Sequence, residues 1–564
     1  MPPLLDSMQD SVEPVNDASN EPVAAPQKKH SWRFWLVFAS LCLISFISAV
    51  DATIVTIALP TITRAIGGEK DYVWVANSFL FAGTATQPFF GQISNIFGRR
   101  HPMLASIVLF ALGSGIAAGA SSISMLIAGR TVQGLGSGGL FVLLDLIICD
   151  LVPLRDRGKY LGFMLSTAAI GTTIGPIMGG GLATANWRWI FYLNLPISGI
   201  ALIAMVFCLK VKYKREPTWK HSLRRIDYTG NAIFISSMTA ILLGLVMGGS
   251  TYPWSSWRII VPLVLGGVGW VVFHFHQASS LCKEPSVPPH LFSHRTSSIG
   301  FLLGFTSSIL LQWVVYFLPL YFQAVLGASP MRAGVDFLPY TVFVVPCGII
   351  AGGFMSKTGL YRPLHWTGFA LSAIGCGLLS TLKEDSSKAE WVCYQMIAAA
   401  GTGVVMSVLL PSTLAALPEK DVATATGTYS FLRSFGFLWG VTLPSIIFNG
   451  QFDRRLDQIT DVGVRELLKN GAAYGYASGG YVARLPDNIR REVVDVYVKA
   501  LRAVWLAAVA FAVFSFLMVF VMKHVELRKE LNTEFGLDEG ETTRSDTAVL
   551  EKGETIDDTT KASV

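Results

Sequence analysis

The sequence predicts an all-α polytopic membrane protein with fourteen transmembrane helices, and three observations support this prediction. The chain has 564 residues, of which 52% are hydrophobic and only 15% are charged. A soluble protein carries about 25% charged residues, so the composition excludes a cytosolic multidomain enzyme. Apolar runs of the roughly 20 residues needed to span a bilayer recur along the chain. Lys and Arg gather in alternate connections between these runs.

The fourteen apolar runs are separated by polar connections, and the seventh and eighth are the least clearly delimited. A polar segment with charges and turn residues follows the thirteenth run. The approximate limits of the runs are 34–59, 72–94, 102–121, 123–150, 159–183, 188–209, 227–248, 258–277, 298–324, 333–355, 363–381, 390–414, 422–448 and 499–523.

The distribution of charge predicts the orientation in the membrane. Connections after even-numbered runs hold most of the loop Lys and Arg, including Arg99, Arg100 and the segment 210–225. Cationic loops are retained on the cytoplasmic side, so both termini are expected inside the cell. The net charge of +6 is not gathered into one patch, and no nucleic-acid partner is expected.

A weak internal repeat predicts the domain organisation. The spacing of Gly91 and Gly98 recurs at Gly352 and Gly359. Parallel repeats in such a chain indicate two six-helix bundles facing a midplane site, with the seventh and eighth runs inserted between them. The predicted parts are a disordered cytoplasmic tail (1–33), an N-terminal bundle (34–210), two linker helices (211–296), a C-terminal bundle (297–523) with an extracellular loop (449–498), and a second disordered tail (524–564).

Two opposite charges lie inside apolar runs at matching depths. Asp51 precedes Pro60, at the outer end of the first run, by nine residues, and Arg130 lies about seven residues into the fourth run. At 1.5 Å per residue both lie roughly 10–14 Å from the outer edge, so they can pair. Burial disfavours a charged carboxylate and a neighbouring Arg favours it, so a modest change in water access switches protonation. The alternative is a fixed ion pair that holds the two helices together.

The second cytoplasmic connection carries a turn motif that runs from Gly91 to Arg100 and includes Asn95, Gly98 and Arg99. The glycines permit a tight turn, and the two arginines place charge at the interface. Asp150, at the cytoplasmic end of the fourth run, is expected to pair with Arg99 or Arg100. Positive charge on an ordinary turn is the alternative.

The fifth run carries Gly171, Gly175 and Gly179 at four-residue spacing, with Pro176 after the second glycine. Small residues at this spacing let another helix approach closely, and a proline bends the helix. Helix packing alone would explain the glycines.

These motifs resemble those of the major facilitator superfamily, and in particular its fourteen-spanner drug:proton antiporters of the fungal toxin and multidrug efflux type. The string from Gly91 to Arg100 is similar to the family's loop signature, in which Asp usually stands where this chain has Asn95. The segment from Arg130 to Gly136 resembles the span-four signature, whose Arg is linked to proton transfer. The string from Gly171 to Gly180 resembles the motif that separates exporters from symporters.

The resemblance implies a proton-coupled efflux transporter of amphipathic small molecules, such as a mycotoxin or an antifungal drug. The residues that the resemblance implies for proton coupling are Asp51 and Arg130. Gating and conformational roles fall to Gly91, Asn95, Gly98, Arg99, Arg100, Asp150, Gly171, Gly175, Pro176 and Gly179.

The resemblance also implies that the first helix of each bundle lines the substrate cavity. The candidate cavity residues are Gln133, Gln312, Trp313, Tyr316 and Arg433. Packing is the alternative for the aromatic residues, and neutralisation of a carboxylate or contact with carbonyls in the second bundle is equally expected for Arg433. Asp145 lies too near the cytoplasmic end to be preferred over Asp51 as the proton carrier.

No catalytic triad, metal cluster or phosphate loop stands out, so we expect no enzyme activity, cofactor or metal, and an ion gradient as the energy source. The expected partners are a small-molecule substrate, protons and the lipid bilayer. A monomer in the cell membrane is expected, with the vacuolar membrane as the alternative. An importer of siderophore-iron or basic amino acids and a non-transporting membrane enzyme or receptor are the other function classes.

Overall fold

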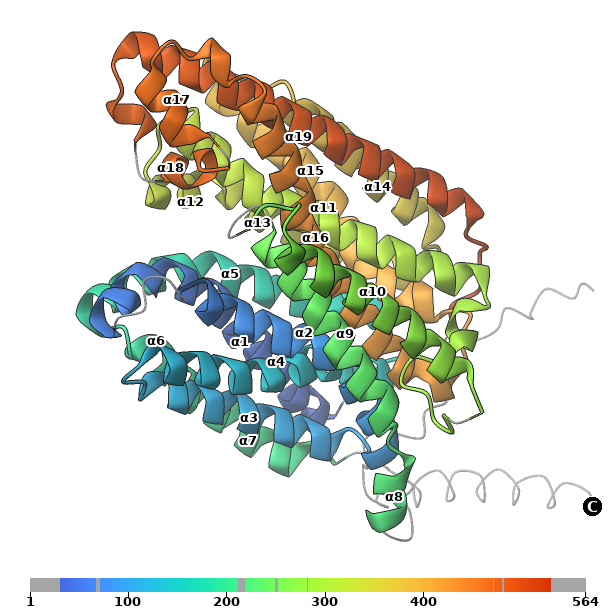
Figure 1. Ribbon diagram of the computed structural model, residues 1–564. Helices are drawn as coiled ribbons and strands as arrows, with labels where there is room; N and C mark the ends of the chain where they lie inside the picture. The colour runs from blue at the N-terminus through green and yellow to red at the C-terminus, as the bar shows by residue number, and fades with distance from the viewer. Residues whose placement is uncertain are drawn as a thin grey trace, which may run out of the picture.

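The structure is a computed structural model that describes residues 31–66, 72–210, 219–248, 252–280, 282–469, 471–478 and 481–528. Figure 1 shows its helices gathered into a lower and an upper bundle, with a helix pair beside both. Nearly all of the two predicted tails lies outside the described residues.

The lower bundle is the N-terminal half, residues 31–210. Its helices are α1 (Trp32–Ile66), α2 (Tyr72–Phe97), α3 (Arg100–Ala118), α4 (Ile123–Leu151), α5 (Arg157–Asn186), α6 (Trp189–Tyr192) and α7 (Asn194–Cys208). The linker follows with α8 (Trp219–Arg225), α9 (Tyr228–Met247), α10 (Trp257–Ala278) and the 3₁₀ turn η1 (Pro289–Phe292).

The upper bundle is the C-terminal half, residues 295–528. Its helices are α11 (Arg295–Ala324), α12 (Pro330–Asp336), α13 (Leu338–Thr358), α14 (Arg362–Leu379), α15 (Lys388–Leu414), α16 (Val422–Asp453), α17 (Val462–Leu468), α18 (Ala473–Ser478) and α19 (Asp487–Val521). The 3₁₀ turns are η2 (Glu419–Asp421), η3 (Leu456–Gln458) and η4 (Val482–Arg484).

Each predicted apolar run coincides with one helix, except the sixth, which covers the consecutive helices α6 and α7, and the tenth, which covers parts of α12 and α13. Eleven helical segments among the described residues are long and apolar enough to cross a membrane. The helices α2, α5 and α14 correspond to the three other runs but do not qualify, so the count of fourteen spans is not confirmed. In α2 the cause is visible in the sequence, because Gly, Thr, Ser, Asn and Gln dilute its apolar residues.

Local signals fix several helix ends. The Ser122 side chain caps α4 by accepting from the Met125 N–H, and Ser387 and Glu390 form a capping box at α15. At the other end of a helix, Gly359 terminates α13 with φ of +75°, a left-handed conformation that glycine adopts without strain. Gly98 has the same φ between α2 and α3, so the two glycines of the repeat serve the same turn.

The two halves repeat one packing pattern. In the N-terminal half α1 packs on α5 and α7, while α4 packs on α2 and α3. In the C-terminal half α11 packs on α16 and α19, while α15 packs on α13 and α14. The halves meet where α2 contacts α16 and where α5 contacts α13. We call these two contacts the seams between the halves. The internal repeat relates them, because α2 corresponds to α13 and α5 corresponds to α16.

The linker pair α9 and α10 covers one of these seams. The helix α9 contacts both α2 and α16, and its Phe234 ring lies 4.9 Å from that of Phe431. Gln92 of α2 accepts from Asn231 (2.9 Å) and donates to the Glu284 carbonyl (2.6 Å). The linker is therefore fastened to both halves by apolar contacts and to α2 by buried amides.

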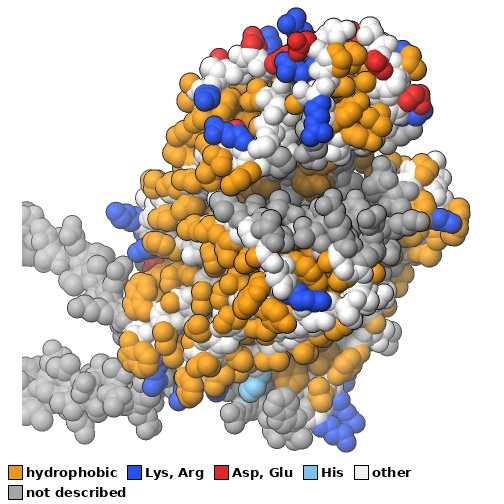
Figure 2. All heavy atoms as spheres, turned by 90° about the vertical axis from the view of Figure 1, so that its left-hand side faces the viewer, with side chains coloured by type: hydrophobic (Ala, Val, Ile, Leu, Met, Phe, Trp, Pro, Cys, Tyr) orange, Lys and Arg blue, Asp and Glu red, His pale blue; other side chains and the backbone are white. Residues whose placement is uncertain are grey.

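The polar segment 449–498 differs from the predicted loop. The helix α16 continues to Asp453, α17 and α18 fold within the segment, and α19 already begins at Asp487. Polar contacts hold these parts: the Glu492 carboxylate accepts from the Thr460 N–H at 2.8 Å. Figure 2 shows charged side chains gathered over the upper bundle on this face of the molecule.

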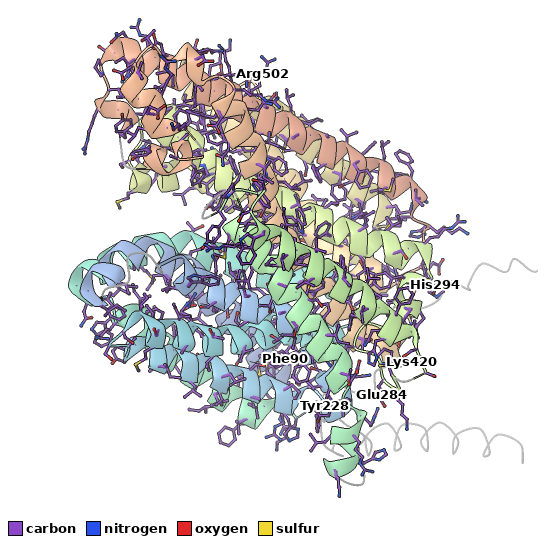
Figure 3. All side chains as sticks on the ribbon, viewed as in Figure 1. Phe90, Tyr228, Glu284, His294, Lys420 and Arg502 are labelled. Atoms are coloured by element: carbon purple, nitrogen blue, oxygen red, sulfur yellow. The ribbon has the colours of Figure 1, made fainter. Side chains whose placement is uncertain are left out.

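We call the end of the molecule that carries α8 and the α2–α3, α4–α5 and α13–α14 connections the basic end, and the end that carries α6, α12 and α17 the opposite end. Figure 3 shows Tyr228, Glu284 and Lys420 together toward the basic end. The helices of the two halves lie closest toward the basic end and diverge toward the opposite end (Figure 1).

Candidate functional site

The centre of the N-terminal half holds a closed polar network around Asp51. This carboxylate is fully buried and accepts from Arg130 (2.6 Å), Gln133 (2.8 Å) and Asn194 (2.7 Å). The Ser114 hydroxyl in turn accepts from Gln133 and Asn194. Four helices, α1, α3, α4 and α7, therefore contribute side chains to one hydrogen-bond network.

The guanidinium of Arg130 also has other partners besides Asp51. It donates to the Gln133 side-chain oxygen (2.6 Å) and to the Val75 carbonyl (3.3 Å), and it lies 4.2 Å from the centroid of the Phe79 ring. Only 2% of the residue is exposed. The structure thus brings Asp51 and Arg130 together as the depth argument predicted, and their role in proton coupling stays a prediction.

Two members of this network were not predicted as site residues. Asn194 begins α7 and donates to Asp51 Oδ1, whereas Arg130 donates to Oδ2. Ser114 lies near the end of α3 and accepts from Asn194. An Asn at the start of an apolar run is the signal in the sequence that could have indicated the first of them.

A second buried ion pair lies at the basic end. The Arg99 Nε is 2.6 Å from Asp150 Oδ2, and the same side chain donates to the Ser94 carbonyl at 2.8 Å. Arg100 instead donates to the Val206 carbonyl of α7 at 2.7 Å. Of the two arginines considered for Asp150, Arg99 is therefore the partner. Asn95 is half-buried in the last turns of α2.

The glycines of α5 pack this helix against α1. A Cβ added at Gly171 would lie 2.5 Å from the Phe46 carbonyl oxygen, and one at Gly179 would lie 2.8 Å from that of Ile54. A Cβ added at Gly175 would lie closer still, against the Thr53 side-chain oxygen. The geometry therefore shows close helix packing, while a gating role stays a prediction. Pro176 lies within α5, but its side chain is outside the described part of the chain.

Glycines also line both seams between the halves. A Cβ at Gly91 would lie 3.2 Å from Gly427 of α16, and a Cβ at Gly352 of α13 would lie 2.4 Å from the carbonyl oxygen of Gly158 in α5. Both crossings lie in the part of the molecule toward the basic end. Backbones this close leave no room between the halves there, so the basic end is closed.

Polar contacts reinforce the closure at the α5 and α13 seam. Arg155 donates to the Ser356 carbonyl at 2.6 Å, and the Ser356 hydroxyl donates to Asp156. Arg157 lies 3.7 Å from Glu419. These residues join the α4–α5 connection to α13 and η2, so they tie the two halves together.

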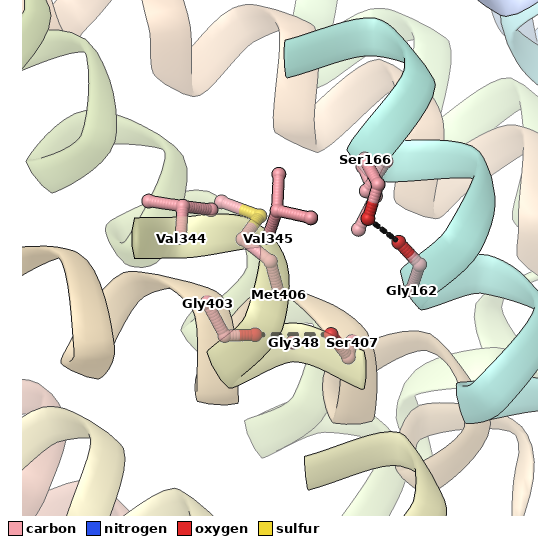
Figure 4. A pocket seen from close by; sticks show the side chains of 9 residues that line it. Gly162, Ser166, Val344, Val345, Gly348, Gly403, Met406 and Ser407 are labelled. Carbon is pink, nitrogen blue, oxygen red and sulfur yellow. Dashed lines mark hydrogen bonds between the residues drawn. The ribbon is translucent and has the colours of Figure 1, made fainter. Parts of the chain in front are cut away.

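A recess of about 20 Å³ lies beside the same seam between α5, α13 and α15 (Figure 4). Its two hydroxyls are bonded to their own helices: Ser166 donates to the Gly162 carbonyl and Ser407 to that of Gly403. Ligand sites usually enclose about 300–1,000 Å³, so this recess is too small to hold an amphipathic metabolite.

The candidate cavity residues occupy different surroundings. Gln133 belongs to the Asp51 network, and Trp313 is fully buried with its ring against Phe511 of α19. Tyr316 is 37% exposed and stacks on Tyr474 of α18, with ring centroids 5.2 Å apart. Of these aromatic side chains, only that of Tyr316 is open to a ligand in this conformation.

The remaining two candidates lie at contacts with α16. The Cβ of Gln312 lies 2.7 Å from the position a Cβ would take at Gly440, so this side chain is at the α11–α16 crossing. Arg433 lies 3.1 Å from Asp145 of α4. The guanidinium therefore neutralises a carboxylate, but one in the first half rather than in the second. Asp145, set aside on sequence grounds, is buried and has a charged partner.

A cluster of possible metal ligands lies in the linker, where Asp227, His276 and Cys282 place ligand atoms within 4.8 Å of one another. The Asp227 carboxylate already accepts from the Gly230 N–H (2.8 Å) and from Gln277 (2.6 Å), with the His276 ring at 3.0 Å and the Cys282 thiol at 3.2 Å. Four partners occupy this carboxylate, so hydrogen bonding accounts for the cluster.

The comparisons with known proteins identify the family. The model of the Major Facilitator Superfamily matches residues 41–441. The chain belongs to this superfamily. It is therefore a multi-pass membrane transporter by family and fold rather than an enzyme.

Relatives and solved structures agree with this assignment. An Aspergillus oryzae protein named MFS efflux transporter aclA is 52% identical over 92% of this chain and 94% of its own length. The Acurin A biosynthesis cluster MFS-type transporter of Aspergillus aculeatus is 44% identical over 91% of this chain and 93% of its own. The human organic anion transporter MFSD10 shares the fold, with a TM-score of 0.53, 16% identity, and coverage of 87% of this chain and 100% of its own.

Proposed function

We propose that this chain is a proton-coupled efflux transporter that exports an amphipathic small molecule, such as a fungal secondary metabolite. The observation that carries the proposal is the buried Asp51–Arg130 pair at 2.6 Å inside the N-terminal half. A titratable carboxylate inside a membrane bundle marks a proton or ion pathway by default. The printed names of the two relatives support export.

The proposed topology has fourteen spans, with α2, α5 and α14 crossing the membrane alongside the eleven apolar segments. The basic end then faces the cytoplasm, because Lys and Arg are retained on that side. On this assignment the structure is closed toward the cytoplasm, and the diverging ends of the halves face outward. We place the protein in the plasma membrane as a monomer.

The proposed cycle uses Asp51 as the proton carrier. Protonation removes the charge that Arg130 neutralises, so the guanidinium turns to its other acceptors and the network around α1 and α4 loosens. Proton and substrate then favour different facings of the cavity, which gives exchange by alternating access. The turn glycines, Asn95, Arg99, Arg100 and Asp150 control closure of the cytoplasmic end.

The test begins with a strain that lacks the gene and the same strain complemented with it. Untargeted mass spectrometry compares each small molecule in the medium with that in the cells. A compound that shifts from cells to medium on complementation supports export. A compound that shifts from medium to cells identifies an importer and overturns the proposal.

A second step tests proton coupling. The compound found in this way is loaded into proteoliposomes that contain the purified protein, and a pH gradient is imposed. Transport that follows the gradient supports proton coupling, whereas transport that ignores it and collapses with another ion gradient contradicts it.

A further inference from the structure

One face of α19 carries a stripe of exposed apolar side chains. They recur every three or four residues along the helix, so they lie on the same side of it. We call this set the α19 stripe, and it consists of Leu506, Ala510, Val513, Leu517 and Phe520. In a helix that crosses a membrane, such a face meets the acyl chains of the lipid.

The α19 stripe ends at a group of basic residues at the basic end. Lys523 and His524 are exposed and follow the end of α19, and Arg362 begins α14, which packs against α19 in the upper bundle (Figure 1). The Tyr361 hydroxyl donates to the Lys523 carbonyl at 3.0 Å. Its ring lies 5.1 Å from that of His524. Tyr361 therefore holds the end of α19 beside the start of α14.

Aromatic rings connect the basic residues with the α19 stripe. The Arg362 guanidinium lies 5.2 Å from the centroid of the Trp366 ring, and that ring lies 5.2 Å from the ring of Phe520. Phe520 is 57% exposed. Trp side chains favour the level of the lipid headgroups. The arrangement therefore places Arg362 at headgroup level, with the stripe running from it into the membrane.

The basic residues have unused capacity to bind an anion. The Nε of Arg362 and the indole N–H of Trp366 have no hydrogen-bond partner among the described residues. Arg528, further along the chain, lies 3.6 Å from Glu419, whereas Arg362 has no such carboxylate partner in the described part of the chain. A guanidinium binds phosphate oxygens through two parallel hydrogen bonds, so a phosphate group fits this corner.

The length of the α19 stripe matches one leaflet of a bilayer. At 1.5 Å per residue, the segment from Ala510 to Phe520 rises about 15 Å. The hydrocarbon core is about 30 Å thick, so this is the depth of half the membrane. Anionic lipids gather in the cytoplasmic leaflet, which the basic end faces on the proposed topology.

We propose that Arg362, Lys523 and His524 bind the headgroup of an anionic phospholipid of the cytoplasmic leaflet, whose acyl chains lie along the α19 stripe. The site contains none of the residues assigned to proton coupling, gating or the substrate cavity. It rests on the proposed function in one respect, namely that the basic end faces the cytoplasm.

The experiment counts lipids on the purified full-length protein. Native mass spectrometry follows a titration in non-ionic detergent with dioleoyl phosphatidylserine or with dioleoyl phosphatidylcholine, which has the same chains but no net charge. Each basic residue near anionic lipid contributes about a fivefold factor in affinity. The wild type is therefore expected to bind its first phosphatidylserine at least about tenfold more tightly than its first phosphatidylcholine.

Arg362→Gln is expected to weaken phosphatidylserine binding about fivefold, and the double variant with Lys523→Gln is expected to lose the preference for it. Arg258→Gln is the matched control. That guanidinium also lies over aromatic rings, 4.8 Å from Tyr252 and 5.7 Å from Trp257, but at the opposite end of the molecule. It is expected to keep the full preference.

A wild type that binds the two lipids equally, or a preference that the double variant keeps, overturns the site. Displacement of phosphatidylserine by an equal concentration of inorganic phosphate contradicts the role of the α19 stripe. If Arg362→Gln fails to fold, the exposed Lys523→Gln decides: binding about fivefold weaker supports the site, and unchanged binding overturns it. No transport is measured, so an absence of export would refute the proposed function and leave the lipid result standing.

Discussion

Asp51→Asn removes the negative charge of the central carboxylate and keeps nearly the same side-chain shape. The amide keeps one acceptor oxygen, but Asp51 accepts from Arg130 on one oxygen and from Gln133 and Asn194 on the other. An amide that turns its oxygen toward Arg130 presents its NH₂ to two other donors. The substitution therefore leaves one side of the network without an acceptor.

The cost can be estimated from the partners that remain. Removing one member of a buried ion pair typically costs about 3–5 kcal/mol, because the other charge is left unpaired. Arg130 keeps the Gln133 oxygen at 2.6 Å and the Val75 carbonyl at 3.3 Å, with the Phe79 ring at 4.2 Å. These neutral partners place the expected destabilisation near the lower end, at about 3 kcal/mol.

The functional magnitude follows from the proton gradient. If one proton is exchanged per substrate, each pH unit sustains about a tenfold substrate gradient, because one unit corresponds to about 1.4 kcal/mol. Asp51→Asn cannot bind the proton and is expected to lose this accumulation while still exchanging labelled for unlabelled substrate.

Both activities are measured in proteoliposomes with the compound identified by metabolite profiling, and thermal unfolding of the purified variant gives the change in stability. A variant that is folded and accumulates substrate as steeply as the wild type would refute the assignment of Asp51 as the carrier. A variant that loses exchange as well as accumulation would show that the carboxylate binds substrate or holds the fold.

Three further substitutions test packing and reactivity. Gly91→Leu forces a side chain into the contact with α16 and is expected to hold the basic end open, which impermeant thiol labelling of seam positions detects. Gly171→Ala is expected to lower stability by about 1–3 kcal/mol in thermal unfolding, because its Cβ meets a carbonyl at 2.5 Å. Gly181→Ala is the control on the same helix, where a Cβ meets nothing within 4 Å. Burial, followed by the hydrogen bond and charge of Asp227, raises the pKa of Cys282 to about 12. Its maleimide labelling should therefore rise about tenfold per pH unit through the range 7–10 and should speed up in Asp227→Asn, whereas a rate that is flat with pH would contradict this.

Much of the fold was predictable from the sequence because the lipid bilayer restricts which segments can cross it. A helix that crosses lipid must carry about 20 apolar residues and satisfy its own backbone, so hydropathy alone located the helices. The same criterion fails for polar helices. The start of α19 at Asp487 and the helices α17 and α18 were not predicted, because charged residues there interrupt the apolar pattern.

The candidate site likewise contains one contact that the sequence predicts and one that it does not. The contact of Asp51 with Arg130 was predictable because the rise of a helix fixes the depth of each residue. The contact of Asp145 with Arg433 was not predictable, because it depends on how one bundle docks on the other and on the rotation of α16 about its axis. Sequence distance and hydropathy carry no information on either quantity.

The linker helices make the two flanks of the molecule unequal. Because α9 is fastened to α2 and contacts α16, the halves cannot separate freely along that side. At the seam formed by α5 and α13, no linker helix among the described residues contacts both halves in this way. In the proposed alternating-access cycle we therefore expect the halves to pivot about the side that carries α9 and α10 and to separate farthest at α5 and α13.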